Sequence, residues 1–523
     1  MPVIKRIYLP LLLLLNAFLF SYETVFERND IENIAARDIY DVLSKIHTTH
    51  GTSYGIIGQP VYFYGTGKSS PEAAFYIDDV FYGRIVSDLS FISVDMIEKI
   101  IVRDISPECA GSEIYIYTRN FDPSVPVSEV RYKDAFFNFR DLSVNVAQTV
   151  IPDLSLSVFA QVTDYRDNRD YSDNFIYPFL KQNYAVKMHF PKTFSFVPFI
   201  DISYLKEKKY LIDADSSLSR PEVLRFAFYF DREFSERFKS RSGATFISEN
   251  SIKKYYDTDI YEELTLSAPV YTLKGKTGVY SGGMKSTAGY AKLSCSAQWP
   301  VNTELTGYVR HSDTYGTILS SRAILEKDIR MLKLSSANGY YYEKMNGGSD
   351  FFTNSLTAES DFSAGNLGFN FRTGIDLVSE RERKYYRAGF TAGKNNRLCL
   401  NSDFIASGCS DKDSDIKNNL ISSLTFGENY FNNKLKINTA LYHIYSEYFI
   451  SENKQTANNL SFNIRIRITD LEFFFGSDNF LKDHYDMSGF KFDLNEHYIY
   501  STVEGFDMRT RDEIWGVRWT FYR

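Results

Sequence analysis

The sequence predicts a large antiparallel β-barrel that spans a membrane, preceded by a small α+β domain. Three observations predict it. The 523 residues include 43 Phe, 39 Tyr and 3 Trp, an aromatic share of 16%. Apolar and polar residues alternate with a period of two through residues 121–523, as they do in barrel strands. The mean hydropathy is −0.29, and the long apolar run lies at the N-terminus, so a bundle of transmembrane helices is excluded.

Composition excludes several other classes of protein. Pro and Gly are not enriched, so the chain is neither disordered nor collagen-like. A net charge of −7 with an isoelectric point near 5.7 argues against a dedicated nucleic-acid binder. Four cysteines in this length exclude a disulfide scaffold.

The N-terminus has the pattern of an export signal. Lys5 and Arg6 form a short basic region, and the apolar segment Ile7–Phe20 follows it. This segment is shorter than the roughly 20 residues that cross a bilayer. We therefore interpret residues 1–21 as a secretory signal peptide and exclude them from the fold. A membrane anchor is the alternative.

Residues 22–120 have a mixed pattern and form the predicted α+β domain. Asn29 and Glu32 have the spacing of a capping box. A helical spacing of apolar residues follows at Ile39, Val42, Leu43 and Ile46. Glycines then interrupt the chain, and short apolar segments typical of strands alternate with polar ones. The sequence therefore predicts one small domain here.

Residues 121–523 form the predicted barrel. In the clearest strand Leu460, Phe462, Ile464, Ile466 and Ile468 alternate with Ser461, Asn463, Arg465 and Arg467. A soluble sandwich alternates in the same way, with its polar face in water. The length of the alternation, without a helical interruption, favours a membrane barrel, in which every backbone group is paired within a closed sheet.

The charge is distributed unevenly between the two regions. Residues 22–120 contain 8 basic and 15 acidic groups, whereas residues 121–523 contain 49 basic and 51 acidic groups. An acidic domain inside a lumen that displays residues such as Arg465 and Arg467 would be held partly by complementary charge. A solvated acidic face on an independent periplasmic domain is the alternative.

Three motifs in Ala73–Arg119 resemble the plug domain of TonB-dependent outer-membrane receptors. The first is an "IDGV"-like turn, with Asp79 where the family usually has Gly. The first motif matches Ile77, Asp78, Asp79 and Val80; the second matches Leu89, Ile92, Ile97, Glu98, Ile100 and Val102; the third matches Ile114, Ile116, Thr118 and Arg119. The glycine-rich loop that precedes the last plug strand in the family is shortened here.

Both ends of the chain extend the resemblance. Glu23, Thr24, Val25 and Phe26 resemble a degenerate TonB box, the extended peptide that pairs with TonB by strand addition. Gly516, Trp519 and Phe521 fit the terminal-strand signal that the barrel-assembly machinery recognises. Tyr522 and Arg523 extend past the usual terminal Phe.

The resemblance implies a 22-stranded barrel of the Gram-negative outer membrane, closed by the plug. It implies import of a scarce solute, such as an iron–siderophore or cobalamin, by energised plug rearrangement. Its implied partners are TonB with ExbB and ExbD, the barrel-assembly machinery, outer-membrane lipid and a small-molecule ligand at the outer face. It implies no cofactor, no enzymatic activity and no nucleic acid. The alternative is a passive, porin-like channel with a vestigial plug, and an adhesin or assembly role is left open.

Three other patterns carry little functional weight. Gly65–Ser69 imitates the end of a P-loop, but Tyr62 occupies the position of the first glycine. His47 and His50 lack an obvious third metal ligand, so no metal site is predicted. Cys399 and Cys409 either bridge an outer hairpin or remain unpaired thiols. No nucleophile elbow or paired carboxylates suggest catalysis.

Overall fold

The protein is described from a computed structural model. The structure describes residues 23–34, 36–43, 45, 49–53, 61–65, 73–83, 92–103, 112–119, 126–135, 139–151, 154–165, 179–190, 196–210, 218–219, 222–250, 254–282, 286–298, 302–312, 316–329, 332–344, 351–364, 366–378, 381–394, 398–409, 416–450, 453–478 and 512–522. The predicted signal peptide, His47 and the shortened loop at 104–111 lie outside these residues. None of the helices in the described residues is long and apolar enough to cross a membrane.

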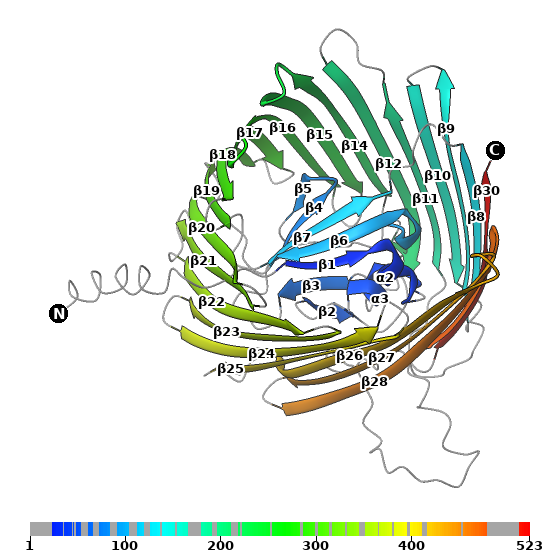
Figure 1. Ribbon diagram of the computed structural model, residues 1–523. Helices are drawn as coiled ribbons and strands as arrows, with labels where there is room; N and C mark the ends of the chain where they lie inside the picture. Colours follow the sequence, from blue (N-terminus) through cyan, green and yellow to red (C-terminus); the bar gives the residue numbers. More distant parts are fainter. Residues whose placement is uncertain are drawn as a thin grey trace.

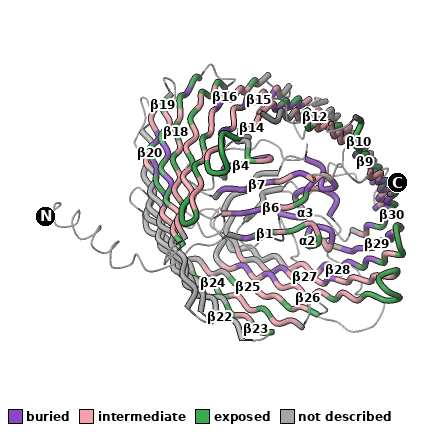
Figure 2. The backbone as a smooth tube through the Cα atoms, turned by 45° about the horizontal axis from the view of Figure 1, so that its top comes forward, coloured by how far each residue is buried: buried purple, intermediate pink, exposed green. Residues whose placement is uncertain are grey.

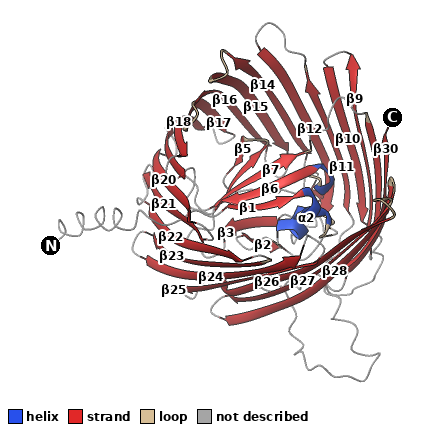
Figure 3. Cartoon of the chain, viewed as in Figure 1, coloured by secondary structure: helices blue, strands red, loops and turns tan. Residues whose placement is uncertain are grey.

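The N-terminal domain is built on a five-stranded sheet in the order β1-β6-β7-β4-β5. Its strands are β1 (Glu23–Glu27), β4 (Ala73–Ile77), β5 (Val80–Gly83), β6 (Ile97–Arg103) and β7 (Ser112–Thr118). A separate hairpin joins β2 (Thr49–Ser53) to β3 (Val61–Gly65). The helical elements are α2 (Arg28–Glu32), α3 (Ile39–Leu43) and the short 3-10 helix Val94–Met96. Figure 3 shows these elements inside the ring of strands.

One face of this sheet packs on the helices to form an aliphatic core. The alternation of β6 and β7 sends the apolar side chains of Ile97, Val102, Ile114 and Ile116 to this face, where none is more than marginally exposed. Helix residues Ile39, Val42 and Leu43 cover them, as their helical spacing predicts. The capping box, however, is formed by Glu27 and Asp30, because the first helix begins two residues earlier than the pair Asn29 and Glu32 requires.

The remaining strands close into a barrel around this domain (Figure 1). They are β8 (Val127–Ala135), β9 (Phe139–Ile151), β10 (Leu154–Tyr165), β11 (Phe179–His189), β12 (Phe196–Tyr210), β13 (Leu218–Ser219), β14 (Glu222–Glu233), β15 (Phe238–Asn250), β16 (Lys254–Ser267), β17 (Tyr271–Gly282), β18 (Ser286–Gln298), β19 (Asn302–Ser312), β20 (Gly316–Ile329), β21 (Leu332–Lys344), β22 (Phe351–Ala364), β23 (Leu367–Val378), β24 (Arg381–Lys394), β25 (Leu398–Cys409), β26 (Ile416–Tyr430), β27 (Leu435–Ile450), β28 (Asn453–Ile468), β29 (Leu471–Asp478) and β30 (Asp512–Tyr522).

The ring closes where the last strand pairs with the first wall strand. β30 runs antiparallel to β8, with Ile514 opposite Ala135 and Tyr522 opposite Val127. β12 pairs directly with β14, and the two-residue β13 pairs only at the end of β12. Apart from β13, the described ring consists of twenty-two long strands. Closure leaves no strand edge in the wall unpaired.

The wall strands alternate in the opposite sense to a soluble protein, because their apolar side chains face outward and their charged side chains face inward. On β30, Trp515 and Trp519 point outward and are about half exposed, whereas Arg518 points inward and is buried against the domain. Figure 2 shows the same division, with exposed residues along the wall and buried ones on β6 and β7. An apolar outer face with charged groups inside suits a barrel surrounded by lipid.

The two cysteines considered for a disulfide cannot pair. Cys399 and Cys409 both lie on β25, ten residues apart, which places their Cα atoms about 33 Å apart along an extended strand. A disulfide needs Cα atoms within about 7 Å. Of the two alternatives, the bridge across an outer hairpin is therefore excluded, because both cysteines lie on one strand. Cys399 is a free thiol.

Candidate functional site: the contact between the inner domain and the wall

The first anchor of the inner domain is Glu32, the last residue of α2. Its carboxylate accepts from the guanidinium groups of Arg465 on β28 and Arg518 on β30. Arg28, one helical turn earlier, places its Nε 3.0 Å from Glu32 Oε1. Glu472 on β29 completes the group, with Oε2 2.9 Å from both wall arginines. Three guanidinium groups and two carboxylates thus form one buried cluster.

This cluster keeps Glu32 ionised. Burial alone would raise the pKa of Glu32, but the positive charges of Arg518, Arg465 and Arg28 outweigh burial and hold the pKa well below its usual range. The carboxylate therefore remains a strong acceptor at neutral pH. Breaking the cluster would leave guanidinium groups buried without sufficient counter-charge.

The second anchor is Asp95, in the short 3-10 helix that Ser93 caps. Its carboxylate accepts from Arg131 and, at 2.7 Å, from the hydroxyl of Ser143. Lys133 lies 3.2 Å away and is fully buried. Burial would raise the pKa of Asp95, but Arg131 and Lys133 bring it far below its usual range. This anchor fixes the inner domain to β8 and β9.

The third anchor is the turn that matches the first plug motif. Asp78 and Asp79 both have positive φ, 50° and 65°, in the two-residue turn between β4 and β5. Aspartate tolerates this conformation better than most residues do. The carboxylate of Asp78 accepts from the backbone and hydroxyl of Thr118, at 2.8 and 2.6 Å, and lies 3.1 Å from Lys187 on β11. Arg225 on β14 donates to the carbonyl of Ile77 at 3.2 Å.

The fourth anchor is Glu113 on β7, which is fully buried. Its Oε2 lies 2.9 Å from Arg322 Nη1 on β20, and its Oε1 lies 3.9 Å from Lys292 Nζ on β18. The hydroxyl of Tyr115 donates to the same carboxylate at 3.0 Å. Burial raises the pKa of Glu113, but Arg322 and Lys292 outweigh it and bring the pKa to about 2.

The charge complementarity expected from the sequence is present, with one correction. Arg465 faces inward and pairs with Glu32 and Glu472, as expected of a lumenal arginine. Arg467 does not reach the inner domain. It lies at the end of β28 and donates to the backbone carbonyl of Thr469 in the adjoining turn, at 3.0 Å.

The other plug-motif residues have structural roles. Ile97 and Val102 are completely buried in the aliphatic core. Glu98 is exposed on β6, and Val80 begins β5. Asp79 accepts from the Tyr117 hydroxyl at 2.7 Å, which ties the turn to β7.

The residues that resemble a TonB box form a strand of the inner sheet. β1 pairs with β6, with Thr24 opposite Val102 and Phe26 opposite Ile100. Thr24 is buried and Phe26 packs against the core, whereas Val25 is 41% exposed. In the described residues β1 is the outer strand of its sheet. No described strand is hydrogen-bonded to the other edge of β1.

The C-terminal signal residues lie at the closure of the ring. Trp519 and Phe521 face outward with their ring centroids 4.4 Å apart. Gly516 faces inward. A Cβ at this position would lie 2.2 Å from the carbonyl oxygen of Tyr132 and 2.4 Å from the ring of Phe474. Closure between β30 and β8 therefore requires glycine here.

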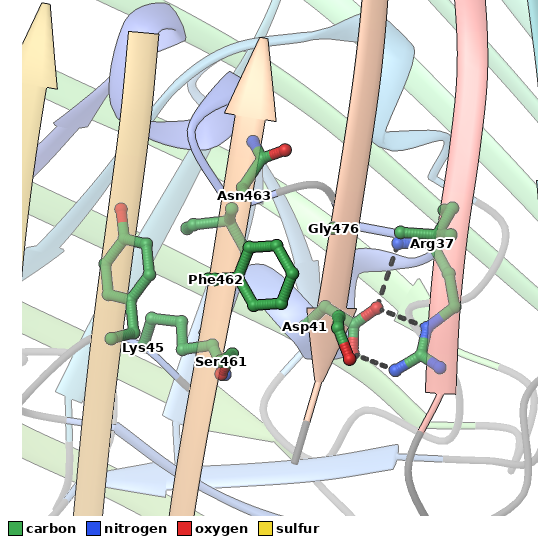
Figure 4. Close-up of a pocket in the computed structure, with 11 residues that line it drawn as sticks. Arg37, Asp41, Lys45, Ser461, Phe462, Asn463 and Gly476 are labelled. Atoms are coloured by element: carbon green, nitrogen blue, oxygen red, sulfur yellow. Dashed lines mark hydrogen bonds and ion pairs between the residues drawn. The ribbon is translucent and has the colours of Figure 1, made fainter. Parts of the chain in front are cut away.

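A narrow crevice runs between the α3 segment and β27–β30 (Figure 4). Arg37 binds Asp41 through two side-chain contacts of 3.0 and 3.1 Å, and Lys45 donates to Ser461 at 3.2 Å. Figure 4 shows the aspartate turned toward the arginine and the lysine beside Ser461. The contact between Lys45 and Ser461 adds to the attachment of the inner domain to β28, whereas the Arg37–Asp41 pair lies within the inner domain. No three His, Cys, Asp or Glu side chains in the described part of the chain meet as a metal would require.

Sequence reasoning missed the individual anchors Glu32, Asp95 and Glu113. The signal available was the acidic surplus of residues 22–120. It predicts that some acidic groups of the domain pair with cations of the lumen, but not which ones, because most carboxylates of a domain are solvated.

No protein-family model matches the sequence, and no curated protein does. Solved structures match over almost the whole chain. The siderophore receptor PirA of Acinetobacter baumannii is 11% identical with a TM-score of 0.77, over 95% of this chain and 98% of that one. The chain has the siderophore-receptor fold.

Two further structures with the siderophore-receptor fold are similar. A double mutant of the ferric enterobactin receptor PfeA of Pseudomonas aeruginosa is 9% identical with a TM-score of 0.78, over 95% of this chain and 98% of that one. FpvA of P. aeruginosa, bound to pyoverdines, is 9% identical with a TM-score of 0.70, over 96% and 86% of the two chains. The predicted resemblance is thus confirmed at the level of the fold, a strand barrel around an N-terminal plug, and the inner domain is called the plug below.

Acid is expected to loosen the plug. The pKa values of Glu32, Asp78, Asp95 and Glu113 are lowered by folding, so their stabilisation is complete above the unfolded values near 4 and is lost as the pH falls through the folded values. For Glu113, a fall from 4.5 to about 2 corresponds to about 3 kcal/mol. Calorimetry in detergent from pH 7 to pH 2.5 should show the plug transition moving to lower temperature below pH 4.5. A transition that does not move would contradict this account.

Proposed function

We propose that the protein is a TonB-dependent receptor of the Gram-negative outer membrane that imports an iron–siderophore complex by energised rearrangement of its plug. The observation that carries the proposal is the plug itself, fixed across the lumen by four carboxylates that pair with wall cations, three of them buried. A barrel whose plug is held in this way is closed at rest. Opening it requires work, because each separated pair leaves buried charges uncompensated.

The similar structures support a chelated-iron ligand. PirA is a siderophore receptor, PfeA is a ferric enterobactin receptor, and one PfeA structure contains enterobactin. At 8–11% identity none of their ligand contacts transfers to this chain. PirA and PfeA are receptors, which agrees with a non-catalytic role.

A passive, porin-like channel with a vestigial plug is not favoured. A vestigial plug would have no need for charged groups in register with the wall. Here Glu32 binds arginines more than 430 residues away in the sequence, and Glu113 binds one 209 residues away. Such pairing supports a plug that still seals its barrel.

The partners follow from this function. TonB, energised by ExbB and ExbD, would add a strand to the plug at Glu23–Phe26. Because β6 already occupies one edge of this strand, the addition would use the other edge or displace β6. The barrel-assembly machinery would recognise the strand that carries Gly516, Trp519 and Phe521, and lipid would surround the wall.

Uptake of iron tests the proposal. Cells that lack their own siderophore receptors and express this protein should accumulate radiolabelled iron supplied as ferric enterobactin or ferric pyoverdine. Accumulation should fall to background in a host without TonB and after a protonophore collapses the proton-motive force. Uptake that continues without TonB would establish a passive channel. Absence of uptake with both chelates would contradict a siderophore ligand of these kinds.

A further inference from the structure

The side chains that join the plug to the wall differ in chemistry from one group of wall strands to the next. Toward β14 and β15 the contact is aliphatic, because Val223 and Ile247 of the wall join the plug's own core. Toward β28–β30 and toward β8–β9 it consists of the charge clusters around Glu32 and Asp95. Toward β18–β20 the plug presents the opposite face of its sheet, which has another composition.

This opposite face carries a row of tyrosines. Tyr76 and Tyr115 stack with ring centroids 4.4 Å apart and planes 10° apart. Tyr117 continues the row at 6.4 Å and 12° from Tyr115. Small or short apolar groups, Ala74 and Ile101, pack beside them. The result is a flat surface of parallel rings and not an interlocking aliphatic one.

Cations lie over these rings. Lys99 lies 4.8 Å from the ring centre of Tyr117, and Arg103 lies 5.1 Å from that of Tyr115. Lys292 reaches from the wall to 5.6 Å from the Tyr76 ring. Such contacts tolerate sliding, since a cation is attracted by the whole face of a ring.

The facing wall repeats this chemistry along its strands. Tyr290 and Tyr308 lie 6.3 Å apart on β18 and β19, and the Tyr290 hydroxyl donates to Asp259. Lys276 lies 4.1 Å from the Tyr261 ring. Arg310 lies 5.2 Å from the Tyr280 ring, farther along the same strands. Rings and cations thus follow one another from the plug sheet along the lumenal side of β16–β19.

Glu113 fastens the plug to this sector. It lies on the tyrosine face of β7 and pairs with Arg322 at 2.9 Å and with Lys292 at 3.9 Å. Arg322 also binds Glu304 of the wall at 2.6 Å, so the wall side keeps a counter-charge when Glu113 leaves. If Glu113 moved away with the plug, Lys292 and Arg322 would face the space opened between the plug and the wall.

We propose that the solute passes between the tyrosine face of the plug and strands β16–β20, and that the Glu113–Arg322–Lys292 contact holds this passage shut. The proposal deepens the transport function above and rests on it. Stacked, amphipathic rings separate into a solvated gap more readily than the aliphatic contact with β14 and β15, because their polar edges and cations remain hydrated. The released cations would favour an anionic solute.

Planar-bilayer conductance of the purified protein tests the passage without ligand or TonB. The intact protein should be silent, and Glu113→Gln and Arg322→Gln should each conduct, at levels below that of a plug-deleted barrel. Glu98→Gln removes the same charge from an exposed site of the plug and should remain silent. Faster migration of unheated protein in a detergent gel confirms that each barrel is folded.

A matched pair of serines locates the passage. Ser294 is two residues from Lys292 and therefore on the same face of β18, whereas Ser423 lies on the lumenal face of β26, two residues from the buried Ile421, and belongs to none of the four anchors. In the Glu113→Gln background, a bulky cationic thiol reagent should abolish most of the conductance of Ser294→Cys and leave that of Ser423→Cys unchanged.

Two outcomes overturn the proposal. Silence of both Glu113→Gln and Arg322→Gln would show that this contact does not hold the passage, and block at Ser423→Cys alone would place the passage on the side of β26. Failure of the proposed function is a separate result, because iron uptake and its dependence on TonB are measured in cells. A conducting Glu113→Gln barrel, together with an unaltered protein that imports no iron, would contradict siderophore import and leave the passage intact.

Discussion

Replacing Glu32 by glutamine is expected to lower the free energy of unfolding of the plug by about 3–5 kcal/mol, the range for removing one partner from a buried ion pair. Glutamine keeps the shape but removes the charge that Arg28, Arg465 and Arg518 share. Glu472 would then be the one carboxylate of the cluster for three guanidinium groups. Urea titration of the detergent-solubilised protein, followed by protease cleavage within the plug, measures the change.

The control is Glu98→Gln, which removes a carboxylate from the same domain at an exposed position of β6. Its effect should remain within about 0.5 kcal/mol, as for most surface substitutions. Equal effects of the two variants would mean that net plug charge matters and the cluster does not. A fall in stability below pH 4.5 that disappears in Glu32→Gln would tie the acid response to this carboxylate.

Replacing Gly516 by valine is expected to prevent most molecules from closing the barrel. The added Cβ would lie 2.2 Å from the Tyr132 carbonyl, which belongs to the backbone of β8 and has no side-chain freedom to move away. Phe474, 2.4 Å away, already packs under Arg131, whose guanidinium lies 4.6 Å from the ring centre. The fraction that refolds from urea into detergent, read as the faster-migrating band on an unheated gel, measures the loss.

Gly289→Val and Gly307→Val are the matched controls. Both positions are wall glycines whose added Cβ meets nothing within 4 Å. They should refold as the unaltered protein does. Refolding of purified protein also separates two roles of Gly516, because no assembly machinery is present. Normal refolding of Gly516→Val combined with failed assembly in cells would assign the residue to recognition and contradict the packing account.

The sequence predicted the local features well, because they depend on residues close together in the chain. The alternation around Leu460–Ile468 determines which side chains of β28 face outward. The turn at Asp78 and Asp79 and the buried face of Ile97 and Val102 follow from motifs a few residues long. The two cysteines show the limit of this reasoning, since the sequence left open a bridged hairpin where the structure has one continuous strand.

The TonB-box resemblance shows the same limit at the other end of the chain. An extended segment with β-branched residues is suitable both for an exposed peptide and for a sheet edge. The pairing of β1 with β6 depends on strand β6, more than seventy residues away, and no property of Glu23–Phe26 alone specifies it.

By itself the sequence therefore predicted a strand wall with an apolar exterior and a lumen that displays charged side chains, and it placed the acidic surplus in the N-terminal domain. Only the tertiary structure decided which charges meet. Glu32 reaches Arg465 and Arg518, and Glu113 reaches Arg322, because ring closure and strand register bring distant residues to one height in the lumen. The physical reason is that alternation fixes the direction of a side chain, whereas an ion pair also requires position, and position is set by every strand of the closed ring together.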